Sequence, residues 1–188
     1  SNSNFRKTKK TNGVKKTTKK KCTLKRKRSY MFKKSKINQF NINKFNKLYS
    51  EYSDSSKNTP GDMTENSIAN IFNNMNYDSN DIIYDLGCGL GKLIFYINFV
   101  YNLNTVGIEL IKDKFTIAKN IGSKLKLKLN KLEENETNVL FNNKNNNKTI
   151  QIISNDLLLD NFDKGTIFYL YNTTWDHSFV NKIITKII

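Results

Sequence analysis

The spacing of apolar residues changes along the chain, and this change predicts where helices and strands alternate. Apolar residues that recur every three to four positions indicate one face of a helix, whereas short consecutive runs rich in Ile, Val and Tyr indicate buried strands. The predicted helices cover residues 37–52, 65–75, 92–101, 112–132 and 178–188. The predicted strands cover residues 82–86, 105–109, 149–154 and 166–171.

Strands and helices that alternate with short connections predict an α/β domain, in which helices flank a parallel sheet. Ligands bind such sheets at the carboxyl ends of the strands, so the residues that follow each strand are the first candidates for a site. We expect this domain at residues 60–188, after a helical lead-in and loop at 37–59. The Asn-rich stretch 142–148 is expected to be a low-complexity loop.

Positive charge is concentrated at the N-terminus. The 188-residue chain has 32 Lys and Arg against 16 Asp and Glu, a formal net charge of +16. Sixteen of the basic residues lie between Arg6 and Lys36, where no acidic residue occurs. Few apolar residues accompany them, so residues 1–36 are predicted to be a disordered basic tail.

A flexible polycation favours anionic partners. This tail best fits contact with DNA or RNA phosphates, or a nuclear address. A membrane surface suits it less, because no face of Trp, Phe and Leu is interleaved with its charges. A solvated tail that only aids solubility is the remaining alternative. The candidate nucleic-acid-binding residues are Lys19, Lys20, Lys21, Lys25, Arg26, Lys27 and Arg28.

The rest of the composition disfavours several classes of protein. No apolar run approaches the ~20 residues that span a bilayer. One histidine, His177, and two cysteines, Cys22 and Cys88, offer neither an ordinary zinc site nor a structural disulfide. We therefore expect no membrane partner, no metal and a reducing compartment.

A glycine-rich turn, Asp85-Leu-Gly-Cys-Gly-Leu-Gly91, joins the first predicted strand to the next helix. Gly87, Gly89 and Gly91 permit positive φ and place no Cβ between the backbone and a ligand. A ligand across this turn can then meet N–H groups at the helix N-terminus. The G-x-G-x-G spacing differs from the dinucleotide fingerprint G-x-G-x-x-G. Two alternative interpretations of this turn are a nucleotide-binding site and a turn with a purely structural role.

Polar residues also follow the other strands. Glu109 ends the second strand, where a carboxylate can accept hydrogen bonds from both ribose hydroxyls of an adenosine. Asp156 and Leu157 follow the third strand, and an Asx-turn or helix cap is their structural interpretation. Asn172 and Trp175 follow the fourth strand and are also candidates for the site. The alternative to a site role for Trp175 is packing against the last helix.

D-L-G-C-G-x-G followed by V-G-I-E resembles the first motif and the next acidic motif of class I S-adenosylmethionine (AdoMet) methyltransferases. The segment Pro60-Gly-Asp-Met-Thr-Glu65 is similar to the Y-G-E-x-T/S-P loop of one family, the non-SET histone lysine methyltransferases of the "disruptor of telomeric silencing" type. The motif order across residues 60–180 is similar to that of this family. The resemblance implies methylation of lysine 79 of histone H3 in nucleosomes, with AdoMet as methyl donor. The tail would contact nucleosomal DNA in the nucleus; a cytoplasmic nucleic-acid compartment is the alternative.

The resemblance also implies a role for each candidate residue. The residues expected around the methionine end of AdoMet are Asp62, Thr64, Asp85, Gly87, Gly89, Gly91 and Lys92. Glu109 would bind the ribose, and Asp156 and Leu157 the adenine. The expected catalytic residues, which align the acceptor amine, are Asn172, Trp175 and Thr64.

Three positions depart from the family pattern: Pro60 replaces Tyr, Asp62 replaces Glu and Lys92 replaces a common Gln. The family's sheet has three strands after the fourth, so this sheet is expected to lack its last strands. Two other functions stay open. One is a class I methyltransferase acting on RNA or a non-histone protein, and the other is a non-catalytic module whose tail binds nucleic acid.

Overall fold

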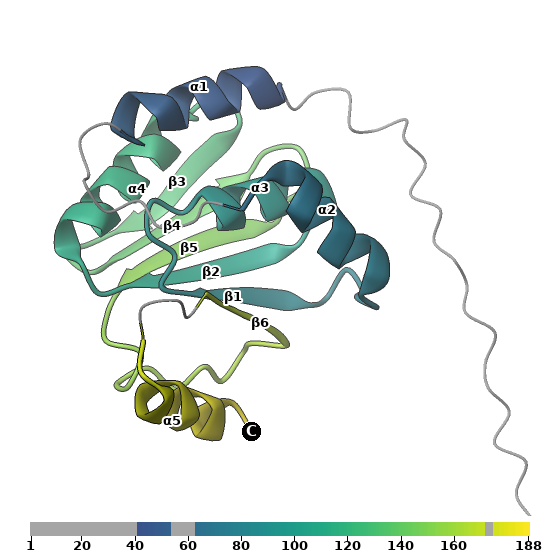
Figure 1. Cartoon of the computed structure of the whole chain (residues 1–188). Helices are drawn as coiled ribbons and strands as arrows, with labels where there is room; N and C mark the ends of the chain where they lie inside the picture. The colour runs from purple at the N-terminus through teal and green to yellow at the C-terminus, as the bar shows by residue number, and fades with distance from the viewer. Residues whose placement is uncertain (1–40, 54–62, 172–174) are drawn as a thin grey trace, which may run out of the picture. The chain divides into compact units, whose positions relative to one another are not determined.

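Six strands form one sheet in the order β3-β4-β5-β2-β1-β6 (Figure 1). The computed structural model describes residues 41–53, 63–171 and 175–188, so the basic tail predicted at residues 1–36 lies outside the described residues. The helices are α1 (Ile42–Ser53), α2 (Glu65–Asn74), α3 (Lys92–Tyr101), α4 (Lys112–Lys124) and α5 (His177–Ile187). The strands are β1 (Ile82–Leu86), β2 (Asn104–Glu109), β3 (Leu129–Glu134), β4 (Asn138–Asn143), β5 (Thr149–Ser154) and β6 (Ile167–Leu170).

The strands predicted from the sequence form the parallel part of the sheet. Strand β1 lies between β2 and β6, and β2 also pairs with β5, all in parallel. In this register Asp85 is opposite both Gly107 and Tyr169, while Glu109 is opposite Ser154. The carboxyl ends of the four strands therefore share one edge of the sheet. The predicted α/β fold is confirmed.

The other two strands correct the prediction of a helix over residues 112–132. Helix α4 ends at Lys124, and an antiparallel hairpin of β3 and β4 then joins the sheet beside β5. Residues 125–128, where leucine and lysine alternate, form a turn, so the helical spacing of α4 does not continue into β3. The predicted loop 142–148 is also shorter, because Asn142 and Asn143 belong to β4. The sheet is therefore mixed rather than all-parallel.

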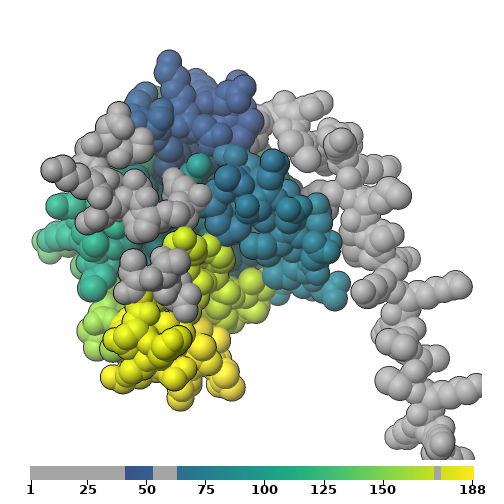
Figure 2. All heavy atoms as spheres, in the orientation of Figure 1, coloured from purple at the N-terminus to yellow at the C-terminus, as the bar shows by residue number. Residues whose placement is uncertain are grey.

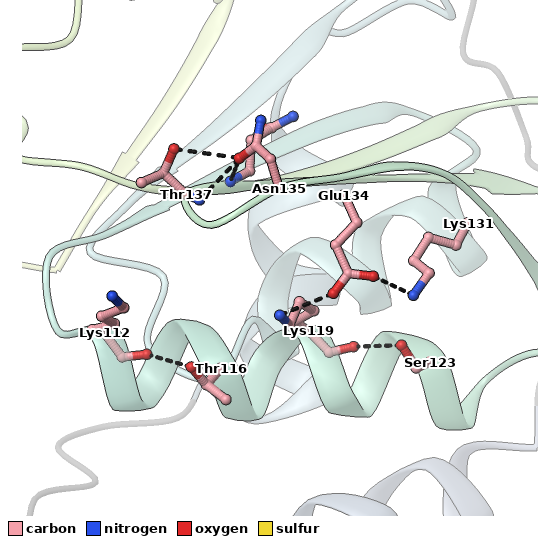
Figure 3. Close-up of polar contacts among 9 residues, drawn as sticks. Lys112, Thr116, Lys119, Ser123, Lys131, Glu134, Asn135 and Thr137 are labelled. Carbon is pink, nitrogen blue, oxygen red and sulfur yellow. Dashed lines mark hydrogen bonds and ion pairs between the residues drawn. The ribbon is translucent and has the colours of Figure 1, made fainter.

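Ion pairs attach this hairpin to α4. Lys119 Nζ lies 2.9 Å from Glu134 Oε1, and Lys131 pairs with the same carboxylate from within β3 (Figure 3). Two carbonyls of α4, those of Lys112 and Lys119, accept hydrogen bonds from the hydroxyls of Thr116 and Ser123. The carboxylate of Glu134 thus links the end of β3 to α4.

Helices cover both faces of the sheet (Figure 1). Helices α1, α3 and α4 bury one face, and α2 packs on the same side over Ile83. Helix α5 lies on the opposite face with Ile183 in its core cluster, and its yellow atoms lie far from the purple atoms of α1 (Figure 2). On α2, Ile68 and Phe72 are buried, whereas Ile71 is 43% exposed.

A fully buried asparagine connects α3 to two strands and to the residue before a third. Asn98 Nδ2 donates to the carbonyls of Leu103 and Thr149 at 2.8 and 3.0 Å. Its Oδ1 accepts a hydrogen bond of 2.8 Å from the amide of Asn143, which is also buried. The side chain therefore ties the end of α3 to β4, β5 and the residue before β2.

Replacing Asn98 with alanine is expected to lower the free energy of unfolding by about 3 kcal/mol, because it removes the hydrogen bonds to the carbonyls of Leu103 and Thr149 and leaves the buried amide of Asn143 without this acceptor. Urea denaturation measures this loss. The exposed Asn130 of β3 is the matched control, and Asn130→Ala should change stability by less than about 0.5 kcal/mol. Equal effects of the two substitutions would contradict a structural role for the Asn98 network.

Candidate functional site

The glycine-rich turn is anchored to β2. Gly87, Gly89 and Gly91 have φ of 86°, 55° and 77°, a region that favours glycine. The N–H groups of Gly87 and Cys88 donate to the carbonyl of Ile108 at 2.9 and 3.0 Å, and that of Gly91 donates to Cys88 at 2.8 Å. These three N–H groups are thus used within the protein. The turn therefore offers fewer N–H groups to a ligand than its sequence led us to expect.

Glu109 connects the turn to the end of β2. Glu109 is 6% exposed, and its Oε2 accepts a hydrogen bond of 2.8 Å from the N–H of Gly89. Oε1 accepts another of 2.8 Å from the N–H of Ile111. Each carboxylate oxygen can accept two hydrogen bonds, so each retains capacity for a ligand hydroxyl.

Gly107 was part of the V-G-I-E motif but was not singled out as a site residue. A Cβ at this position would lie 2.7 Å from Cys88 Sγ and 2.8 Å from Ile94 Cδ1. Only glycine therefore lets the turn pack directly on β2. Burial raises the pKa of the Cys88 thiol well above its usual value, and the negative charges of Asp85 and Glu109 raise it further. Cys88 is thus a neutral packing residue and not a nucleophile.

Asp156 forms the Asx-turn that was its structural interpretation, which the geometry confirms. Its Oδ1 accepts a 2.8 Å hydrogen bond from the N–H of Leu158. The preceding N–H, that of Asn155, donates to the carbonyl of Glu109 at 3.2 Å, so this turn lies beside the end of β2. Leu157 is buried in the core beneath α5. Contacts of Asp156 and Leu157 with adenine stay a prediction.

The start of α2 lies next to the glycine-rich turn. Thr64 caps α2, and its Oγ1 accepts a 3.2 Å hydrogen bond from the N–H of Ser67. The next residue, Glu65, lies 3.9 Å from Lys92 Nζ at the start of α3. Two motifs separated in the sequence therefore converge. A catalytic role for Thr64 stays a prediction, and Asp62 lies outside the described residues.

Trp175 packs against the last helix, which was its alternative interpretation, and its role at the acceptor amine stays a prediction. Its ring centroid lies 5.1 Å from that of Phe179 on α5, so it packs against the last helix. It also lies on the glycine-rich turn, because a Cβ built on Gly87 would come within 3.1 Å of Trp175 Cζ2. Its predicted partner Asn172 lies outside the described residues.

Tyr169 is a candidate that the sequence reasoning missed. It lies opposite the buried Asp85 in the β1–β6 register and thus at the edge where the other candidates gather. Burial raises the pKa of its phenol, and the charges of Asp85 and Tyr171 raise it further, so the hydroxyl is neutral. The only signal was its place near the end of a predicted strand.

A family model described as Histone methylation protein DOT1 matches residues 38–187. The chain belongs to the DOT1 family. This match confirms the resemblance that the motifs carried, and the α/β architecture is consistent with a class I methyltransferase fold. Membership in the DOT1 family makes the chain a histone methyltransferase, and therefore an enzyme with a histone substrate. No curated protein gives a significant match.

Two further features of this DOT1 family member concern metal ions and membranes. Within residues 41–53, 63–171 and 175–188, no group of three or more His, Cys, Asp or Glu could hold a metal ion. None of the helices in the described part of the chain combines the length and apolar character needed to cross a bilayer.

Proposed function

We propose that this enzyme transfers a methyl group from AdoMet to lysine 79 of histone H3 in nucleosomes. One observation carries the cofactor assignment: three candidate segments meet at the carboxyl ends of β1, β2 and β5. Glu109 joins them, through its carboxylate to Gly89 at 2.8 Å and through its carbonyl to Asn155 at 3.2 Å. This is the edge where ligands bind to parallel sheets.

The residues at this edge fit an adenosine with an amino-acid end. No atom lies within 4 Å of a Cβ built on Gly89, which leaves open space above the turn. Beside it, Glu109 offers acceptors for two ribose hydroxyls. Leu110 and Ile111 directly follow and are 67% and 49% exposed, which supplies apolar surface for a purine ring. Asp156 and Leu157 are proposed for the far side of that ring.

AdoMet supplies a methyl group on a sulfonium, and an in-line displacement transfers that group to an amine. The task of the protein is then to align a neutral lysine amine with the methyl carbon. We assign this alignment to Asn172, Trp175 and Thr64. An aromatic wall at Trp175 disfavours the charged form of the lysine by desolvation. Asp62, Asp85 and Lys92 are proposed to surround the methionine moiety with Gly87, Gly89 and Gly91.

The remaining parts of the chain are assigned by their charge and position. The basic residues of 1–36, with Lys19–Arg28 at their centre, are proposed to bind nucleosomal DNA without sequence preference. Residues 37–59 form the lead-in and residues 60–188 the enzymatic domain. Helix α1 of the lead-in packs Phe45 and Tyr49 into the core of that domain. A nuclear, chromatin-bound location follows from this substrate.

Methyl transfer from labelled AdoMet tests the proposal. We expect labelling of H3 in intact nucleosomes, and loss of most of that label when H3 lysine 79 is replaced with arginine. Free histone H3 and RNA are assayed in parallel. Preferential labelling of RNA or a non-histone protein would contradict the histone assignment, and full labelling of the arginine-substituted nucleosomes would contradict the choice of lysine.

A further inference from the structure

Two turns bring a group of lysines together at the start of β3 and β5. One turn, residues 125–128, joins α4 to β3, and the other, residues 144–148, joins β4 to β5. The N–H of Lys144 donates to the carbonyl of Lys128 at 2.9 Å, and Lys144 Nζ donates to the carbonyl of Lys126 at 2.8 Å. Lys126, Lys128 and Lys144, which we call the lysine cluster, are therefore held in one place.

The lysine cluster lies at the end of the sheet opposite the proposed cofactor site. Strand β5 begins at Thr149, directly after the second turn, and ends at Ser154. Ser154 is opposite Glu109 in the register of β5 and β2. A strand of six residues spans about 17 Å. The cluster and the cofactor edge are thus separated by the length of a strand.

Charges of opposite sign are separated along the β3–β4 hairpin. Residues 124–131 contain four lysines and no acidic residue, whereas residues 133–136 contain three glutamates and no basic residue. The start of β3 pairs with the end of β4, so the lysines of both turns gather at one end of the hairpin and the glutamates lie at the other. The described domain therefore has a basic end, although its acidic and basic residues are similar in number.

Neighbouring carboxylates leave the charge of this end uncompensated. Among the described residues, neither Lys126 nor Lys144 forms an ion pair, whereas the adjacent Lys124 lies 3.3 Å from Glu51. The carbonyl end of α4 attracts cations, which explains the bond of Lys144 to a carbonyl beside that end. It does not explain the exposed Lys126. Clustered positive charge of this kind favours an anionic partner.

The other residues of the two turns indicate which anion fits. Asn145 and Asn147 are exposed beside Lys144, and amides of this kind donate to phosphate oxygens of nucleic acids. Single-stranded RNA is usually held by aromatic side chains on which its bases stack. Residues 124–131 and 144–148 contain no aromatic residue. Duplex DNA needs none, because its bases are stacked on each other.

We infer that the lysine cluster binds the phosphate backbone of duplex DNA, as a second contact besides the one proposed for the basic tail. This contact belongs to the folded domain and is independent of DNA sequence. Because the cluster lies at the opposite end of β5 from the cofactor edge, DNA and AdoMet can bind at the same time. The inference goes beyond the proposed function, since it requires neither AdoMet nor a histone.

Fluorescence anisotropy with the full chain and a duplex of about 30 base pairs, between about 50 and about 200 mM salt, tests this inference. The double variant Lys126→Gln/Lys144→Gln should bind DNA more weakly. Its plot of log affinity against log salt should be shallower by about 2, since each lost phosphate contact lowers the slope by about 1. Lys126→Arg/Lys144→Arg keeps both charges and should bind like the wild-type chain.

Lys164→Gln/Lys182→Gln is the matched control, because it removes the same charge from two exposed positions elsewhere on the domain. This control should keep the wild-type slope. Affinity for S-adenosylhomocysteine should be equal in all variants, and melting temperatures show whether each variant folds. Acetylation read by mass spectrometry locates the contact, since duplex DNA should protect Lys126 and Lys144 but not Lys182.

Three results would overturn the inference. The first is an unchanged slope for Lys126→Gln/Lys144→Gln, or a change equal to that of the control. The second is the absence of protection of Lys126 by DNA. The third is tighter binding of single-stranded RNA than of duplex DNA through the same lysines. None of these results affects the proposed methyl transfer, which is tested separately with labelled AdoMet.

Discussion

Replacing Glu109 with alanine is expected to abolish AdoMet binding and, with it, methyl transfer. The substitution removes both proposed acceptors for the ribose hydroxyls. It also removes the acceptors that hold the N–H groups of Gly89 and Ile111, each at 2.8 Å. The turn then loses its side-chain attachment to β2 in the same step. Two lost charge-assisted hydrogen bonds correspond to an affinity loss of roughly 100-fold or more.

Calorimetric titration with S-adenosylhomocysteine measures this effect, with thermal melting as the check on folding. Glu109→Gln keeps the size of the side chain and one carbonyl acceptor, so it should retain part of the affinity. The exposed Glu133 of β3 provides a control acid at a distance from the site in the sheet, and Glu133→Ala should bind like the wild-type chain. Unchanged binding by Glu109→Ala would refute the location of the cofactor site.

Removal of residues 1–36 is expected to weaken nucleosome binding while leaving AdoMet affinity unchanged. These residues carry 16 of the 32 basic residues and no acidic one. The remaining chain has equal numbers of basic and acidic residues, so the truncated protein has no net charge with which to attract DNA. Each phosphate that the tail neutralises releases counterions, and the affinity therefore depends steeply on salt.

The measurement is nucleosome affinity between about 50 and about 200 mM salt, by fluorescence anisotropy. At low salt we expect a loss of roughly tenfold or more, with a shallower dependence of affinity on salt. A tail of unchanged length in which the basic residues are replaced by Ser and Gln separates charge from length, and it should behave like the truncation. Equal loss of nucleosome and AdoMet binding would contradict the role assigned to the tail.

Local sequence was sufficient for the parallel half of the fold. Strand β1 and helix α3 have the predicted bounds, because an apolar run, three glycines and a second apolar run each act within a few residues. The hairpin β3–β4 was missed because Leu125–Leu132 supports two periods, and α4 suggested that the helix continues. Pairing with β4 stabilises the strand at residues 129–134. This pairing was not predicted, because the Asn-rich end of β4 resembles a loop in the sequence.

In the candidate site, too, some features follow from local sequence and others depend on contacts between distant segments. Glu109 was predicted at the end of a strand, but its hydrogen bond to Gly89 joins residues 20 positions apart and depends on how β2 lies beside β1. Tyr169 was missed for this reason, because its significance comes only from Asp85, its neighbour on another strand. A motif identifies the residues that approach the backbone of a turn, whereas tertiary contacts determine which side chains surround it.

The contact between Trp175 and Gly87 gives the enzyme an internal optical reporter. Trp175 is the single tryptophan of the chain, so all indole emission originates beside the glycine-rich turn. Its ring also touches Phe179, and any shift of α5 or of the turn therefore changes the polarity around one fluorophore. Binding at the proposed cofactor and acceptor sites is therefore expected to change the emission of this one residue in the unlabelled protein.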